Sequence, residues 1–224
     1  MQSLYAGIDL HSNNNVLVVT NEEDEVVYRR RLVNELKQVV HALSPFEKEL
    51  AGVVVESTYN WYWLVDGLME QGFKVHLANT GAIQQYSGLK YADDESDARW
   101  LAKLLRLGIL PQGYIYPRED RPVRDLLRKR AHLVRQRTSN LLSIQNLFAR
   151  NTGRRLSANS VGRLTCADVD KMLPNGDLAL AVQSSVTVMH TLNGEIQRLE
   201  TTALERVGLR GDFRRLLTIK GVGP

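Results

Sequence analysis

The sequence has little of several features that would place a protein in a class at once. It contains a single cysteine, Cys166, so an internal disulfide is excluded, as is typical of proteins from a reducing cytosol. No apolar run approaches the roughly 18–20 residues that a membrane span needs, and the N-terminus lacks the pattern of a secretory signal. No Cys/His spacing indicates zinc. We therefore expect a cytoplasmic protein without a membrane partner.

Acidic residues are scarce in one segment of the chain. The 224 residues include 29 Lys and Arg and 25 Asp and Glu, which gives a formal net charge of +4. Residues 119–155 contain ten basic and three acidic residues, whereas residues 1–118 contain 11 and 15, and residues 156–224 contain eight and seven. With 43% hydrophobic residues the chain is globular in composition. The concentrated positive charge indicates a nucleic-acid partner.

The first hundred residues alternate short apolar runs with helical patterns. We predict strands over about 4–9, 16–20, 25–32, 52–56 and 73–77, and helices over about 35–43, 59–71 and 94–107. The short connections between the first three strands predict an antiparallel meander. Strands that alternate with helices after a meander predict an α/β domain with a mixed sheet, which we assign to residues 1–117.

The remainder of the chain has a helical pattern. Apolar residues recur every three or four positions over about 122–150 and 177–207, which predicts a long antiparallel, coiled-coil-like pair in a domain over residues 118–208. The last residues, Lys220-Gly221-Val222-Gly223-Pro224, resemble the hairpin of a helix-hairpin-helix unit, whose glycines let backbone amides approach a phosphate. Proline commonly opens a helix, and the sequence stops at Pro224, where the second helix of such a unit would begin. We therefore expect residues 209–224 to be the start of a truncated further domain.

Four carboxylates fall where predicted strands end or a predicted helix begins. Asp9 ends the first strand, Glu56 ends the central strand, and Asp94 and Asp97 share one face of a helix start. Carboxylates gathered at one sheet edge repel each other unless cations neutralise them. Mg²⁺ prefers such oxygen ligands, and two Mg²⁺ ions can promote phosphoryl transfer. A turn role for Asp9 and capping roles for the helix acids stay open. For His11 an approach to the acidic site also stays open, although we favour the role of a polar turn residue.

Cations follow one side of the predicted helix over 122–150. Each cation that neutralises a phosphate gains affinity through counterion release. A solvated helix face is the alternative, although such a face usually mixes charges of both signs. The predicted nucleic-acid-binding residues are Arg121, Arg124, Arg128, Lys129, Arg130, Arg135, Arg137, Lys220, Gly221 and Gly223.

Several segments together resemble the DEDD transposases of bacterial insertion sequences, a family related to the Piv DNA invertases. They are Gly7-Ile8-Asp9, Glu56-Ser57-Thr58 with the aromatic residues that follow, Ala92–Ala98 with Leu101-Ala102, and Arg124–Arg128. The resemblance implies an RNase H-like, RuvC-like fold in which Asp9, Glu56, Asp94 and Asp97 are catalytic and bind Mg²⁺. Asp93 is an alternative third acid, and we choose Asp94 for its three-residue spacing to Asp97.

The resemblance also implies an activity and partners. Family members are transposases and site-specific recombinases that cleave and exchange DNA strands, guided by a structured bridge RNA, and they assemble as dimers or tetramers through the long helices. Their nucleophilic serine belongs to a second domain, which here would follow Pro224. We therefore expect this chain, in a bacterial cytoplasm, to retain metal and RNA binding without full strand exchange.

Two other functions stay open. A metal-dependent nuclease or Holliday-junction resolvase would use the same four acids without a serine. A non-catalytic nucleic-acid-binding and dimerisation module would use the acids only structurally. An actin-like ATPase ranks last, because Asp9 is not followed by a glycine-rich phosphate turn.

Overall fold

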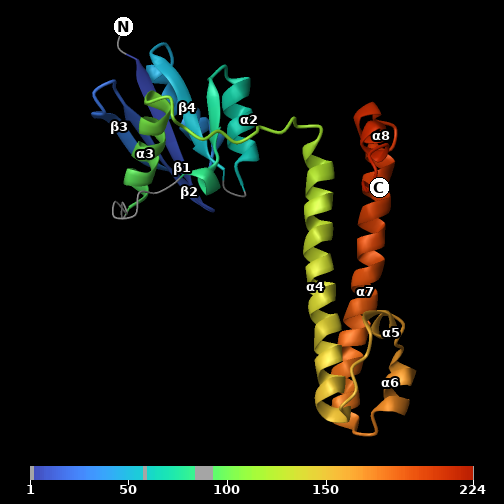
Figure 1. Cartoon of the computed structure of the whole chain (residues 1–224). Helices are drawn as coiled ribbons and strands as arrows, with labels where there is room; N and C mark the ends of the chain where they lie inside the picture. Colours follow the sequence, from blue (N-terminus) through green and yellow to red (C-terminus); the bar gives the residue numbers. More distant parts are fainter. Residues whose placement is uncertain (1–2, 58–59, 84–92, 224) are drawn as a thin grey trace. The chain divides into compact units, whose positions relative to one another are not determined.

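A computed structural model describes residues 3–57, 60–83 and 93–223 and divides into two units, Met1–Ile115 and Tyr116–Pro224 (Figure 1). We call them the sheet unit and the helical unit. Thr58, Tyr59, Ala92 and Pro224, which entered the sequence motifs, lie outside the described residues. Within the described ranges, no helix has both the length and the apolar character that a membrane crossing requires.

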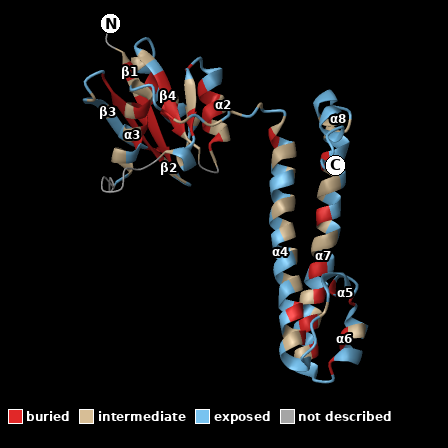
Figure 2. Cartoon of the chain, in the orientation of Figure 1, coloured by how far each residue is buried: buried red, intermediate tan, exposed pale blue. Residues whose placement is uncertain are grey.

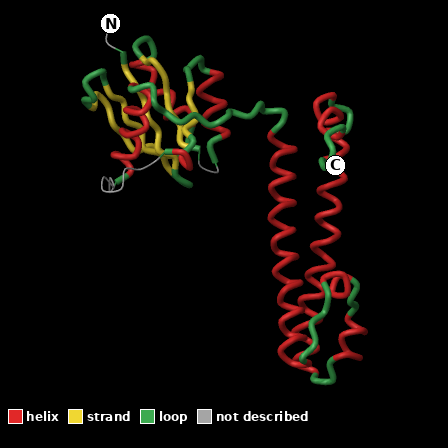
Figure 3. The backbone as a smooth tube through the Cα atoms, viewed as in Figure 1, coloured by secondary structure: helices red, strands yellow, loops and turns green. Residues whose placement is uncertain are grey.

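The sheet unit is built on a five-stranded mixed sheet in the order β3-β2-β1-β4-β5 (Figure 3). The strands are β1 (Leu4–Leu10), β2 (Asn14–Thr20), β3 (Val26–Val33), β4 (Leu50–Glu56) and β5 (Val75–Ala78). The first three strands form the predicted antiparallel meander, and β4 pairs in parallel with both β1 and β5. This mixed α/β architecture is the predicted one, and it is compatible with an RNase H-like fold.

Helices cover both faces of the sheet. On one face, α1 (Leu36–Leu43) and α2 (Tyr62–Glu70) bury a core that includes Ile8, Leu17 and Val55 (Figure 2). On the other face, α3 (Asp94–Arg106) packs against strands β1, β2 and β4. Short 3-10 turns, η1 (Ser44–Phe46) and η2 (Thr80–Ala82), complete the unit. The apolar runs of the central strands are explained by this double coverage.

The strand register decides which side chains lie on the face that α3 covers. Asp9 pairs with Val16 on β2, and Val16 pairs with Arg31 on β3. Directly opposed residues project from the same face of a sheet, so these three form one row. Glu56 continues the row on β4, because the preceding residues of the two strands, Ile8 and Val55, are register partners.

A glycine lets α3 lie close to the sheet. A Cβ atom on Gly7 would lie 1.9 Å from the backbone oxygen of Ala98, a distance that no side chain tolerates. The absence of a side chain at Gly7 therefore permits the backbone of α3 to approach β1. This approach brings the first turn of α3, with Asp94 and Asp97, to the end of the strand that carries Asp9.

The helical unit is organised around two long helices, α4 (Arg121–Thr152) and α7 (Gly176–Val207), which lie side by side and run in opposite directions (Figure 1). Gly153, with a φ of 69°, ends α4 in the left-handed conformation. Two short helices, α5 (Ala158–Gly162) and α6 (Cys166–Met172), occupy the connection, where we predicted no element. A further helix, α8 (Gly211–Leu217), follows α7.

The core of the helical unit lies at one end of the long pair. Ile144 and Phe148 of α4 are buried there against Val182 and Met189 of α7 and against the connection (Figure 2). Near the beginning of α4, by contrast, Leu127 is 50% exposed. The apolar repeat of α4 is thus buried over only part of its length, and a coiled coil along the whole pair stays a prediction.

Candidate functional site

Acidic residues from three elements line one pocket of the sheet unit. Asp9 comes from the end of β1, Glu56 from the end of β4 and Asp97 from the first turn of α3. Together with His11 and Trp100 they line a pocket of about 360 Å³. Three of the four predicted acids therefore meet, because β1 and β4 are parallel neighbours and α3 starts above their carboxyl ends.

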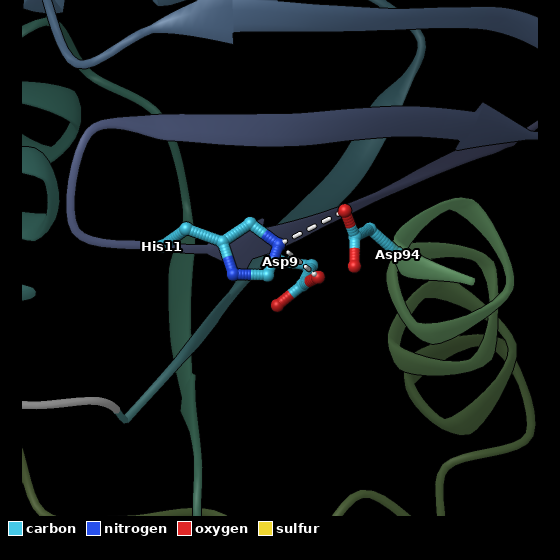
Figure 4. A group of neighbouring side chains, drawn as sticks. All are labelled: Asp9, His11 and Asp94. Atoms are coloured by element: carbon cyan, nitrogen blue, oxygen red, sulfur yellow. Dashed lines mark ion pairs between the residues drawn. The ribbon is translucent and has the colours of Figure 1, made fainter. Parts of the chain in front are cut away.

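The fourth predicted acid, Asp94, is joined to this pocket through His11 (Figure 4). Nε2 of His11 lies 3.0 Å from Oδ2 of Asp9 and 3.3 Å from Oδ2 of Asp94. One ligand atom from each of the three residues lies within 4.8 Å of the others, which is compatible with a shared metal ion. This contact favours the alternative that we left open for His11, an approach to the acidic site, over the polar turn role that we preferred. The spacing of two from Asp9 was the available signal, since alternate residues of a strand share a face.

The crowding of carboxylates changes their protonation. Burial raises the pKa of Glu56 from its ordinary 4.5 to about 8, helped by a side-chain hydrogen bond with Asp9 and by repulsion from Asp9 and Asp97. Burial, followed by repulsion from Asp9, also raises the pKa of Asp97. Without a cation, Glu56 therefore holds a proton near neutral pH. A divalent cation would reverse this effect, because it favours the ionised carboxylates.

Asp93 and Asp94 have different roles in the structure. Asp93 is the N-cap of α3, where its carboxylate accepts a hydrogen bond of 2.7 Å from the backbone N–H of Ser96, which lowers its pKa. The pKa of Asp94 is lowered first by a hydrogen bond from Arg31 and then by the neighbouring His11. The carboxylate of Asp93 thus caps the helix terminus, whereas that of Asp94 contacts His11. We call Asp9, His11, Glu56, Asp94 and Asp97 the acidic cluster.

The donor set fits a divalent cation. Asp9 is only 5% exposed, and its Oδ2 lies 3.0 Å from Nε2 of His11, yet neither atom makes a hydrogen bond within the described ranges. Two buried polar atoms that face each other without a hydrogen bond are costly, so they indicate a site for a ligand between them. Several carboxylate oxygens with one imidazole nitrogen are suitable ligands for divalent ions. Asp9, His11 and Asp94 could hold such an ion, with Glu56 and Asp97 next to it.

Three of the arginines predicted to bind nucleic acid are engaged within the helical unit. Arg121 is 5% exposed, and its Nε donates a hydrogen bond of 2.8 Å to the backbone oxygen of Tyr116. The guanidinium of Arg124 lies 4.5 Å from the centre of the Tyr116 ring. Arg130 forms an ion pair of 2.6 Å with Glu200. The sequence pattern did not reveal these partners, and burial of Arg121 removes it from the surface that a phosphate would reach.

The other predicted contacts are more accessible. Arg137 donates to Asn193 over 3.3 Å, whereas in the described part of the chain Arg128, Lys129 and Arg135 are exposed and form no ion pair. The hairpin residues that follow α8, Lys220, Gly221 and Gly223, are also exposed, and Gly221 has a φ of 91°. These residues remain candidates for phosphate contacts.

A second group of basic residues lies beside the acidic cluster and was not predicted. Arg29, Arg30 and Arg31 of β3 line a hollow of about 590 Å³ together with residues at the start of α3. Arg29 forms an ion pair of 2.5 Å with Glu95, and Arg31 one of 2.5 Å with Asp94. Three consecutive arginines on an edge strand were the signal, but only the strand register reveals that two of them lie near the acids.

Comparison with known protein families agrees with this architecture. A family model described as a transposase, of the IS110 type of DEDD transposases, matches residues 6–150, which is more than half of the chain. The chain therefore belongs to this transposase family, whose members are in broad terms enzymes of DNA transposition encoded by insertion sequences. DNA is accordingly the class of substrate. No curated protein matches the chain.

Proposed function

We propose that this chain forms the Mg²⁺-dependent acidic site of an RNA-guided DNA transposase, in which Asp9, Glu56, Asp94 and Asp97 are the catalytic metal ligands. The observation that carries this proposal is the pocket shared by Asp9, Glu56 and Asp97, in a chain whose family acts on DNA. Oδ2 of Asp9 and Nε2 of His11, which are buried 3.0 Å apart without a hydrogen bond, support it further. An RNase H-like, RuvC-like fold over residues 1–117 is part of the same proposal.

The chemistry of such a site follows from its residues. Bound Mg²⁺ would activate an attacking oxygen and stabilise the leaving oxygen of a phosphodiester. Asp9, fixed in β1, would hold the ion, and Glu56 would hold it once its proton is lost. His11 lies within reach of both Asp9 and Asp94 and keeps these carboxylates together. Trp100 forms part of the wall of the pocket.

The remaining parts of the proposal rest on the family resemblance. A serine nucleophile would come from a domain that begins at residues 209–224, and a bridge RNA would select the DNA. The long helices of residues 118–208 would join two or four copies, and Arg128, Lys129 and Arg135 are the accessible cations for nucleic acid on α4. We propose that the chain alone binds metal and RNA but does not complete strand exchange.

Titration with Mg²⁺ in a calorimeter tests the acidic site. We expect Asp9→Ala and Asp97→Asn to weaken binding at least tenfold, a loss of about 1.4 kcal/mol or more. Glu47→Gln is the matched control, because Glu47 is an exposed acid of the same unit outside the pocket, and it should leave the affinity unchanged. Unchanged affinity in Asp9→Ala would contradict the proposal and favour a non-catalytic binding module.

A cleavage assay separates the transposase from its nearest rival. The chain with Mg²⁺ and a branched DNA junction should give no cleaved product, because the serine nucleophile is supplied by another domain. Cleavage that requires Mg²⁺ and is lost in Asp97→Asn would instead identify a metal-dependent nuclease or Holliday-junction resolvase. Complete recombination of a plasmid by this chain would contradict the proposed division of labour.

A further inference from the structure

Arg31 lies at the edge of the acidic cluster, although it belongs to an edge strand that has no part in the proposed ligand set. It shares a row of the sheet with Val16 and Asp9, on the face that α3 covers. Its side chain is 55% exposed, so the guanidinium is accessible to a large ligand. A cation in this position is next to any DNA strand that enters the acidic site.

The contact between Arg31 and Asp94 uses the oxygen that faces the cluster. The NH2 atom of Arg31 lies 2.5 Å from Oδ2 of Asp94, and the same oxygen lies 3.3 Å from Nε2 of His11. A second nitrogen of Arg31, NH1, donates to Oδ1 of Asn14 over 2.6 Å. The guanidinium thus holds the oxygen of Asp94 that a shared metal ion would need. Arg31 and the metal ion are competitors for this oxygen.

Arg31 needs a new anionic partner when it leaves Asp94. A metal ion on Asp94 repels the guanidinium and removes its acceptor, and exposed ion pairs contribute little, so the exchange is inexpensive. The nearby hollow is lined by Arg29 and Arg30 as well, opposite the acids Asp93, Asp94 and Glu95 at the start of α3. The guanidinium offers a planar fork of donors that matches phosphate oxygens, which makes a phosphate the suitable new partner.

We propose that Arg31 is a phosphate-binding residue of the acidic site, which Asp94 holds in the metal-free protein and releases to a DNA phosphate when a divalent cation binds. The proposal rests on the proposed function, in which Asp94 is a metal ligand. Metal binding and DNA binding are thereby coupled, because the divalent cation that binds Asp94 also frees Arg31 to bind a DNA phosphate.

Arg29 provides a matched control. It lies two residues before Arg31 on the same strand, and its NH1 atom also pairs with an α3 carboxylate at 2.5 Å. That partner is Glu95, which does not line the acidic pocket. Arg29→Ala and Arg31→Ala therefore remove the same charge from the same strand, and they differ in whether the freed carboxylate belongs to the cluster.

The first measurement is Mg²⁺ affinity of the full chain without DNA, by calorimetry. We expect Arg31→Ala to bind Mg²⁺ about two- to fivefold more tightly than Arg29→Ala, the factor that corresponds to the loss of one exposed ion pair. Both side chains are exposed on an edge strand, so both variants should fold, which their thermal melting temperatures would check.

The second measurement is the salt dependence of duplex DNA binding, with Mg²⁺ and with EDTA. In Mg²⁺, Arg31→Ala should reduce the slope of log affinity against log salt by about one, because one phosphate contact is lost. In EDTA, where Asp94 holds Arg31, the slope should equal that of the unaltered chain. Arg29→Ala should give the same slope change under both conditions.

Two results would overturn the role of Arg31. Equal Mg²⁺ affinity in Arg31→Ala and Arg29→Ala would exclude competition for Asp94, and an unchanged slope of Arg31→Ala in Mg²⁺ would exclude the phosphate contact. A failure of the proposed function gives a different result, since the unaltered chain would then bind no Mg²⁺ at all.

Discussion

The sheet unit gathers charged side chains of one sign in a pocket, whereas the helical unit spreads them along a helix. In the sheet unit, Asp9, Glu56 and Asp97 are gathered into one pocket, where burial, and after it the neighbouring carboxylates, raise the pKa of Glu56 to about 8. In the helical unit, Arg121 and Arg130 are distributed along α4, and each bonds a neighbour of its own. The gathered carboxylates are stabilised when a cation binds between them, whereas Arg121 and Arg130 are already stabilised by their neighbours.

The difference follows from the geometry of the two units. Register in a sheet brings together residues that are distant in sequence, and α3 closes over them only because Gly7 has no side chain. A single long helix separates its residues by about 1.5 Å per position along the axis, so its cations stay apart, and Arg121, Arg124 and Arg130 each contact a separate neighbour. Mg²⁺ binding by the sheet unit should accordingly be sensitive to changes in packing. DNA binding by the helical unit should tolerate single substitutions.

The largest effect is expected from Gly7→Ala. The added Cβ would overlap the backbone oxygen of Ala98, at 1.9 Å, and would force α3 away from β1. We expect the free energy of unfolding of the sheet unit to fall by about 3 kcal/mol, the upper range for overpacking. Mg²⁺ binding should be lost as well, because Asp94 and Asp97 move with the helix. Urea denaturation and calorimetry measure the two effects.

Gly194→Ala in α7 is the control for this change. The space around a Cβ at Gly194 is open within 4 Å, so alanine should stabilise the helix, by up to ~1 kcal/mol, and leave Mg²⁺ binding unchanged. If Gly7→Ala were as stable as the unaltered chain, the close approach of α3 would not be what positions the acids.

A second effect, on the pH dependence of stability, should come from the titration of Glu56 in the absence of cations. Its pKa is about 8 in the folded chain, against an ordinary value of 4.5, so the folded state binds the proton more tightly. The stabilising contribution is complete below about pH 4.5 and is lost as the pH rises to about 8. Thermal melting in EDTA across this range should record the decline, and Glu56→Gln should flatten it. Saturating Mg²⁺ should do the opposite and stabilise the protein more as the pH rises.

The sequence was sufficient to predict what depends on local periodicity. The meander, the central strand that ends in Glu56 and the helix that begins at Asp94 follow from alternation, β-branched runs and three-residue spacing. The meeting of Asp9 and Glu56 could also be predicted, because neighbouring parallel strands end at the same edge of a sheet. The contact of His11 was open from its spacing to Asp9, whereas that of Arg31 could not be predicted, since it depends on which residues of β1, β2 and β3 are opposite each other.

Two features of the helical unit were missed for other physical reasons. The helices α5 and α6 are too short to show a period, although the cap residues Ser157 and Thr165 were local signals for them. The contacts of Arg121 and Arg124 are made with Tyr116, which precedes the helix and is not part of its pattern. A helical projection reveals which cations share a face, but it does not reveal which of them already have partners.

A comparison of Asp93 and Asp94 should give an effect of about 1 kcal/mol. Asp93→Ala removes the N-cap of α3 and should lower the free energy of unfolding by about 1 kcal/mol, while Mg²⁺ affinity falls less than twofold. Asp94→Ala should do the reverse, with Mg²⁺ affinity reduced about tenfold and little loss of stability. Urea denaturation and calorimetry separate the two. The opposite assignment, with metal binding lost in Asp93→Ala, would make Asp93 the third acid.

The smallest effect, and the one that tests the helical side of the comparison, is expected from Arg128 and Arg130. Arg128 is exposed, whereas Arg130 is paired with Glu200 at 2.6 Å. Arg128→Ala should therefore reduce the slope of log affinity against log salt for duplex DNA by about one, and Arg130→Ala should reduce it by less. Removal of Arg130 also leaves Glu200 without its partner, so a loss of affinity with an unchanged slope would reflect repulsion of the DNA by that carboxylate. Equal slope changes in the two variants would mean that Arg130 exchanges Glu200 for a phosphate, and that the cations of α4 are as available to DNA as their sequence pattern predicts.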